Sequence, residues 1–317
     1  MKRLLLLCLL LSTVGAQAAT WFATTSSANI DAVTWRGTQG ASCAGSGTTL
    51  TYASRSAGDV FNSNGCTSIA INGDPGVGGS NVTLTTDATN TGGGFTYATA
   101  TNITMHVTIT CANSATLTIT GSTGGGTISG NITGCLGGSV SAVSDSHTVV
   151  TVTVNGNITG GSGSTASNFG YLMNGTTGFV VINGNVTGGS STGGNTFGIN
   201  SNQSSTGTTT VNGNCIGGTL NFTNEGCSGQ GTTALILVGS SIASLRSGGV
   251  NGSIRFTPAA TNYALFAKDS SYTTGVIDTH ATQMPTDPGV ANVKTGTAYG
   301  SLTGTLAASA AAASGNW

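Results

Sequence analysis

The feature that most limits the possible folds of this chain is a turn motif that recurs at a nearly constant interval. "VNGNITGGS" from Val154 returns as "INGNVTGGS" from Ile182 and, more loosely, as "VNGNCIGG" from Val211. The asparagines that begin successive N-[IV]-T elements lie 29, 26, 28 and 29 residues apart; they are Asn102, Asn131, Asn157, Asn185 and Asn214. Internal periods of about 20 to 50 residues are typical of solenoids, propellers and arrays.

The length and composition of the repeat select among these architectures. A propeller blade needs about 40 residues, and a leucine-rich repeat needs regular leucines, which this unit lacks. Thr, Val and Gly, which are abundant in the unit, disfavour helix. A coil of three short strands separated by Gly/Asn turns fits the length, with coils stacked about 4.8 Å apart. The sequence therefore predicts an all-β chain that forms a single-stranded, right-handed parallel β-helix (solenoid) with N- and C-terminal caps.

The alternation in "TVTVNGN" predicts which side chains fill each coil. Val152 and Val154 are expected to point inward, and Asn155-Gly156 to turn the corner because both residues tolerate positive φ. Equivalent residues are expected to stack from coil to coil. Two core columns are predicted, Val154, Ile182 and Val211 in one and Ile158, Val186 and Ile216 in the other. A third column is a ladder of turn amides from Asn155, Asn183 and Asn212; sugar or ion binding by these asparagines is the alternative interpretation.

The N-terminus has the pattern of a secretory signal peptide. Lys2 and Arg3 precede an apolar run at 4–11, and the small-residue motif Ala16-Gln17-Ala18 follows. The segment is too short for a transmembrane anchor. We therefore expect residues 1–18 to be removed and the protein to be secreted.

The cysteine count suits an exported chain. Six cysteines follow the signal peptide, an even number that favours disulfides, with pairing between sequence neighbours as the simplest arrangement. They are Cys43, Cys66, Cys111, Cys135, Cys215 and Cys227. The sequence has no CxxC and no Cys/His cluster at metal-ligand spacing, so neither a metal site nor a cofactor is predicted.

The low charge excludes two classes of partner. Only 5% of residues are Asp, Glu, Lys or Arg, against roughly a quarter in ordinary soluble domains. No basic residue lies between Arg55 and Arg246. Phosphate neutralisation and polybasic membrane attachment both need clustered Lys and Arg. Neither nucleic acid nor an anionic membrane surface is therefore an expected partner.

Composition divides the mature chain into four segments. Residues 19–75, which are comparatively rich in aromatic side chains, are expected to form the N-terminal cap and the first coil. Residues 76–253 carry the solenoid repeats of about 28 residues. Residues 254–283 are expected to form a C-terminal coil or cap. Residues 284–317 contain two prolines and an Ala-rich run, and we expect an extended or partly disordered tail.

An enzyme on this scaffold would need clustered acid and base groups. Pectate-lyase-like and other carbohydrate-active β-helix enzymes use carboxylates grouped on one face, and residues 76–245 contain only Asp87, Asp145 and Glu225 as acids. Asp145 and His147 would share one face of a strand. With Glu225 they are the candidate catalytic residues if the chain is a secreted enzyme. The favoured interpretation is that Asp145 and His147 are exposed turn residues and that the chain is not an enzyme.

Two segments resemble virion-associated proteins. Residues 292–307, "NVKTGTAYGSLTGTLA", are similar to a C-terminal module of bacteriophage and virus-like structural proteins, V-x-x-G-x-x-Y-G followed by G-T-L. The matching residues are Val293, Gly296, Tyr299, Gly300, Gly304, Thr305 and Leu306. The repeats resemble the Gly/Thr-rich solenoid segments of the same tail-fibre-like proteins.

The resemblance implies a non-enzymatic structural or host-attachment role. Its partners would be surface glycans or other virion or surface proteins, and a homotrimer is one assembly that it implies. The signal peptide departs from this family, because virion proteins assemble in the cytosol. An adhesin of a bacterial cell surface is therefore the alternative.

Overall fold

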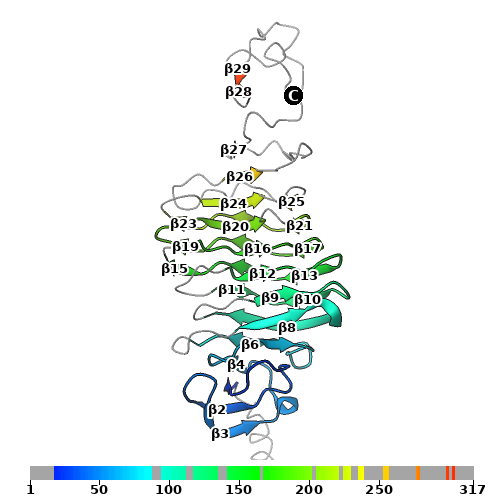
Figure 1. The fold of residues 1–317 in the computed structure, drawn as a ribbon, viewed down its shortest axis with the longest axis vertical. Coiled ribbons are helices and arrows are strands. Elements are labelled where there is room, and N and C mark those ends of the chain that lie inside the picture. The colour runs from blue at the N-terminus through cyan, green and yellow to red at the C-terminus, as the bar shows by residue number, and fades with distance from the viewer. Residues whose placement is uncertain are drawn as a thin grey trace, which may run out of the picture.

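The computed structural model describes residues 18–87, 94–111, 117–134, 141–164, 167–201, 205–220 and 224–229, with short strands at 235–238, 253–256, 276–278, 298–299 and 302–303. Within these residues the chain is a parallel β-solenoid whose strands stack along one long axis (Figure 1). The predicted all-β solenoid fold is confirmed. The helical elements of the described part are two 3₁₀ turns, η1 (Tyr52–Ser54) and η2 (Thr99–Thr101).

The main sheet runs the length of the solenoid and has fifteen strands in the described residues. Its principal path, in spatial order, is β3 (Gly45–Leu50), β2 (Trp35–Gln39), β1 (Thr20–Ala23), β4 (Val60–Asn62), β6 (Val82–Thr85), β8 (Ile103–Thr110), β10 (Gly126–Ser129), β13 (Thr151–Asn155), β17 (Phe179–Ile182), β21 (Thr208–Val211) and β25 (Leu235–Val238). A branch continues from β8 through β11 (Ile132–Thr133), β14 (Ile158–Thr159), β18 (Val186–Thr187) and β22 (Cys215–Ile216).

Two further sheets form the other sides of the coils. The second sheet comprises β5 (Ile69–Ile71), β7 (Phe95–Ala98), β9 (Leu117–Thr120), β12 (Val143–Asp145), β16 (Tyr171–Met173), β20 (Thr196–Ser201), β24 (Asn224–Gly229), β26 (Ser253–Phe256) and β27 (Val276–Asp278). The third comprises β15 (Ser162–Ser164), β19 (Ser190–Ser191) and β23 (Thr219–Leu220). A central coil therefore has four strands, for example β13 to β16, where the repeat length predicted three.

The first predicted core column follows the register of the main sheet. Val154 on β13 pairs with Ile182 on β17, which pairs with Val211 on β21, and all three side chains are fully buried. Ile128 precedes Val154 in the same column. Alternation along the strand explains why these residues are the buried ones, because successive side chains point to opposite faces and only every second one reaches the interior.

The second predicted core column needs one correction. Ile158 pairs with Val186, but Val186 pairs with Cys215 and not with Ile216. Cys215 directly follows the asparagine of its corner, as Ile158 and Val186 do, so it takes the inward position and Ile216 is turned outward. Cys215 is bonded across the interior to Cys227, which is also buried. A disulfide thus occupies the place of aliphatic packing in this coil.

The N-terminal end is closed by an antiparallel hairpin. Strands β2 and β3 pair with each other, and β2 pairs with β1, whose other edge begins the parallel stack at β4. The buried Trp35 ring packs edge-on against Phe61 at 4.8 Å between ring centroids. This hairpin covers the terminal edge of the stack, which would otherwise expose unpaired backbone groups.

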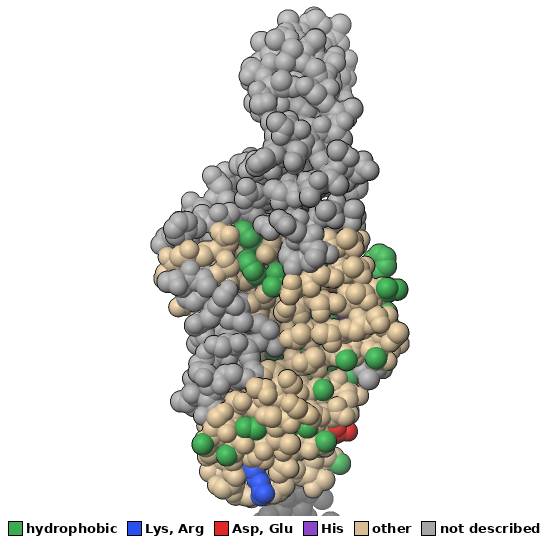
Figure 2. Space-filling model, viewed as in Figure 1, with side chains coloured by type: hydrophobic (Ala, Val, Ile, Leu, Met, Phe, Trp, Pro, Cys, Tyr) green, Lys and Arg blue, Asp and Glu red, His purple; other side chains and the backbone are tan. Residues whose placement is uncertain are grey.

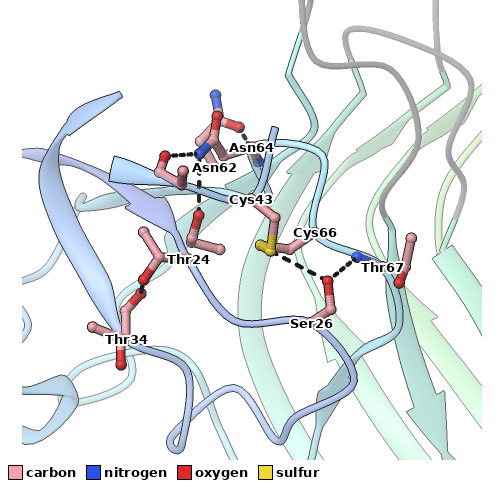
Figure 3. The surroundings of a disulfide bond; sticks show 10 residues. Thr24, Ser26, Thr34, Cys43, Asn62, Asn64, Cys66 and Thr67 are labelled. Atoms are coloured by element: carbon pink, nitrogen blue, oxygen red, sulfur yellow. Dashed lines mark hydrogen bonds between the residues drawn. A yellow bond between two sulfur atoms is a disulfide. The ribbon is translucent and has the colours of Figure 1, made fainter. Parts of the chain in front are cut away.

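A disulfide fastens this cap to the first coil (Figure 3). Cys43, in the loop between β2 and β3, is bonded to the buried Cys66 beyond β4. Beside it the Asn64 amide donates to the carbonyls of Ala23 and Ala44 at 3.1 and 2.6 Å. The predicted neighbour pairing is therefore confirmed for Cys43–Cys66, as it is for Cys215–Cys227.

Several sequence predictions fall wholly or mostly outside the described residues. Cys111 is also disulfide-bonded, while Cys135 lies outside the described residues, as does the signal peptide up to residue 17. Within residues 254–283 the structure describes residues 254–256 of β26 and all of β27. Both strands extend the second sheet. Of the tail, the described part is one antiparallel pair, β28 (Ala298–Tyr299) with β29 (Leu302–Thr303).

Candidate binding face

The predicted ladder of turn amides lies along the corner that follows β13, β17 and β21. The Asn183 amide donates to the Asn155 side-chain oxygen at 2.7 Å, and the Asn212 amide donates to that of Asn183 at 2.6 Å. All three side chains are exposed. The Asn183 amide both donates and accepts along the axis, so the ladder fixes side chains that would otherwise be mobile in solvent.

The reason for glycine at this corner differs from the predicted one. Neither Asn155 nor Gly156 has φ in the left-handed region. A Cβ on Gly156 would instead lie 2.1 Å from the carbonyl oxygen of Gly130, and one on Gly184 would lie 2.2 Å from that of Gly156. Glycine is required because consecutive corners stack backbone on backbone.

A second asparagine ladder runs beside the first, on the other side of the glycine. The side-chain oxygen of Asn131 accepts the backbone N–H of Asn157, and the pattern repeats from Asn157 to Asn185 and from Asn185 to Asn214, each at 2.9 Å. Each of these asparagines therefore closes the corner of the next coil. This bond explains why the N-G-N spelling recurs.

An outward column of threonines lies two residues further along each strand. The register places its members opposite one another on five successive strands: Thr85, Thr110, Thr133, Thr159 and Thr187. Thr133, Thr159 and Thr187 belong to the N-[IV]-T motif, but the alignment of Asn102 with Asn131 hid the continuation of the column to Thr110 and Thr85. In the structure Ile109 pairs with Ile132, so Thr108 and not Asn102 stands in the position of Asn131. A gap of six residues in the expected period had hidden the true register.

We call these three outward columns together the ladder face. Glycines border it: a Cβ on Gly134 would lie 2.5 Å from the backbone nitrogen of Gly161, and one on Gly160 would lie 2.4 Å from that of Gly189. Both glycines are buried, so beside the threonine column consecutive coils stack backbone on backbone, as they do at the N-G-N corner.

From β11 to β22 the ladder face lies in coils without an exposed Asp, Glu, Lys or Arg side chain among the described residues. From residue 88 to residue 224 the sequence has one Asp, Glu, Lys or Arg residue, Asp145, and its side chain is fully buried. Figure 2 shows Lys or Arg and Asp or Glu side chains only towards the N-terminal end of the face in view. Hydroxyls, amides and backbone groups are the polar chemistry that the described central coils offer to a ligand.

The sequence interpretation of Asp145 and His147 as exposed turn residues is wrong. Both side chains are fully buried, and the His147 Nδ1 lies 2.6 Å from the Asp145 Oδ1. The Tyr171 hydroxyl donates to the other carboxylate oxygen at 2.6 Å, and the Thr176 hydroxyl donates to the Asp145 carbonyl at 2.6 Å. Asp145 ends β12 at an inward position because Ile119 and Met173 are its partners in the ladder.

The environment of this pair shifts two pKa values. Burial lowers the pKa of His147, but the hydrogen bond to Asp145, the Asp145 charge and the Val150 carbonyl together raise it above the ordinary 6.5. Burial, the Asp145 charge and the hydrogen bond to that carboxylate raise the pKa of Tyr171 well above its usual range. The network is a hydrogen-bonded cluster inside the solenoid, where burial keeps a polymer substrate from contact with it.

A second carboxylate–imidazole pair lies at the surface, and sequence analysis overlooked it. His106 Nδ1 lies 2.7 Å from Asp74 Oδ2, with both side chains about one-third exposed (29% and 35%). Burial acts to raise the pKa of Asp74, but hydrogen bonds from His106 and Gly76 lower it below its usual value. The sequence separation of 32 between the partners hid the pair. Glu225, the third candidate, lies on β24 opposite Phe197, on the third strand after β12 in the second sheet and in a different register.

Within the described residues, His, Cys, Asp and Glu form no group of three or more that would hold a metal ion. The same residues contain no helix with the length and hydropathy to cross a membrane.

The ladder face is therefore the candidate site, and its assignment depends on its own geometry. No protein-family model, curated protein or solved structure matches the chain.

Proposed function

We propose that the chain is an exported, non-enzymatic β-solenoid protein of a virion or cell surface, which adheres to neutral glycans through the ladder face. The observation that carries this proposal is the in-register array of amides and hydroxyls without formal charge. Ladder hydrogen bonds hold the asparagines in place before any ligand arrives. Binding to an array that is already ordered costs less side-chain entropy than binding to mobile side chains.

The chemistry of the array favours a hydroxyl-rich, uncharged ligand. Asn amides and Thr hydroxyls both donate and accept hydrogen bonds, as sugar hydroxyls do. An anionic ligand would find no Lys or Arg between residues 88 and 224 to neutralise it. The disulfides support export, because such bonds persist in oxidising compartments. The tail-fibre-like resemblance and a homotrimeric assembly belong to the same proposal.

Salt dependence tests the neutral character of the interaction. Binding of the purified protein to an array of neutral and anionic glycans is measured at low and high ionic strength. We expect neutral glycans to be bound with an affinity that changes less than about twofold between 0.05 and 0.5 M salt, since screening acts only on charges. Binding restricted to anionic glycans, or abolished by salt, would contradict the proposal.

A matched pair of variants tests the face itself. T159K places a charge in the exposed threonine column, and S144K places the same charge on the outward side of the second sheet. We expect T159K to weaken binding by about tenfold or more, as for a residue near the centre of an interface, and S144K to bind like the wild type. Equal effects of the two variants would show that the glycan does not bind at the ladder face. Release of sugar from any polysaccharide would support the enzyme alternative instead.

A further inference from the structure

Two large apolar side chains project from neighbouring coils at the start of β13 and β17. Val149 is 73% exposed and Phe179 is 53% exposed, the exposed large hydrophobics of the described residues. The Phe179 N–H donates to the Val150 carbonyl at 2.8 Å, and Phe179 pairs with Thr151. Val149 and Phe179 therefore form one local projection, here called the apolar knob.

The backbone of the knob is strained. The Val150 N–H donates to the Thr148 carbonyl at 2.8 Å, which closes a three-residue turn with Val149 at its centre and φ of 70°. A γ-turn with positive φ is rare and strained, and a β-branched residue in that region adds to the strain. Val149 is also exposed, so its side chain adds no core packing that would offset the strained backbone.

The buried Asp145–His147 pair supports the knob from below. His147 Nδ1 is held by Asp145 Oδ1 at 2.6 Å, and His147 Nε2 lies 3.2 Å from the Val150 carbonyl oxygen. A Cβ on Gly178 would lie 2.5 Å from the same Nε2, so the imidazole packs directly against the residue before Phe179. One buried group thus fixes both the strained turn and the start of β17.

The surroundings of Phe179 are hydroxylic and uncharged. Thr151 and Thr208 flank it in its own outward column. The first asparagine ladder begins four residues further along the strands, about 13 Å away at the usual strand rise. An aromatic ring beside hydroxyls matches a sugar, which presents an apolar C–H face together with hydroxyls at its rim.

We propose that the apolar knob is the subsite that seats a sugar ring of a neutral glycan. Phe179 and Val149 contact the C–H face of the ring, and the Thr151 and Thr208 hydroxyls bond to its rim. This inference rests on the proposed glycan adhesion and names the residues that would dominate it. A second copy of the chain, docked through the same apolar side chains, is the competing occupant.

The test uses the full-length protein on the neutral glycan array, with four variants. F179A is expected to weaken binding by about tenfold or more, whereas F179Y, which keeps the ring, retains it. L172A, which truncates an apolar residue on the outward side of the second sheet, is the control and binds like the wild type. V149G relieves the strained turn, so we expect it to raise the urea midpoint and yet to weaken binding.

The outcomes distinguish a failure of the knob proposal from a failure of the proposed glycan adhesion. If the wild type binds neutral glycans while F179A and V149G bind equally well, the knob is wrong and glycan adhesion stands. If the wild type binds no neutral glycan, both proposals fail. Mass measurement supplies the remaining arm: an oligomer that F179A converts to monomers would make the knob a contact between copies and would overturn the glycan subsite.

Discussion

Asp145 places a carboxylate where the adjacent coils hold Ile119 and Met173. Removal from water makes such a group costly unless it is paired and hydrogen-bonded, and here His147, Tyr171 and Thr176 bond to its side chain or carbonyl. The spelling "SDSHT" gives no sign of burial, because polar residues between strands are ordinarily turns. Only the register against the neighbouring coils reveals that β12 ends with an inward position.

The His147–Asp145 pair makes stability depend on pH in a defined direction. The folded-state pKa of His147 lies above its ordinary 6.5, so the folded protein holds that proton more tightly than the unfolded chain. The stabilisation is complete below about pH 6.5 and is lost as the pH rises through the raised value. We therefore expect the free energy of unfolding, from urea denaturation, to fall as the pH rises from about 6.5 through the raised pKa of His147. The D145N/H147Q double variant should show a flatter profile, and an identical slope would refute the assignment.

At the scale of the strand and its corner, the stacking of backbone decides which residues are allowed. The N-G-N corner was visible in the sequence, and so were the Val154 and Ile158 columns, because period and alternation are local signals. The sequence did not show why the corner needs glycine, nor that Cys215 takes the inward position, because both depend on the distance between coils. The Asn102 misalignment has the same origin: a motif match one coil away does not reveal the register.

The stacked glycines predict a position-specific cost of adding one methyl group. In G184A the new Cβ would meet the Gly156 carbonyl oxygen at 2.2 Å, so the coils must separate or shift. We expect a loss of about 1 to 3 kcal/mol in the free energy of unfolding, as for overpacking in a core. G73A is the matched control, because no atom lies within 4 Å of its Cβ position, and it should change stability by less than about 0.5 kcal/mol. Comparable losses in the two variants would show that stacking is not the cause.

At the scale of the whole molecule, each coil contacts mainly the coils before and after it. Stability in such a stack is roughly a sum of local terms and interfaces between neighbours, so a defect at one end has limited reach. The disulfides lie at different levels of this stack: Cys43–Cys66 joins the cap to the first coil, and Cys215–Cys227 crosses the interior near the last coils with described side chains. Their places predict which part of the molecule each one protects.

Removing the cap disulfide should therefore loosen one end of the molecule. The bond closes a loop of 23 residues, for which chain entropy gives a stabilisation of about 3 kcal/mol. In the C43A/C66A variant we expect hydrogen exchange, followed by mass spectrometry, to speed up in β1 to β6 and to stay at the wild-type rate in β13 to β21. C215A/C227A should show the opposite distribution, with faster exchange in β21 to β24. Faster exchange along the whole chain in either variant would mean that the coils unfold as one cooperative unit, and the ladder face would then be only as stable as the cap.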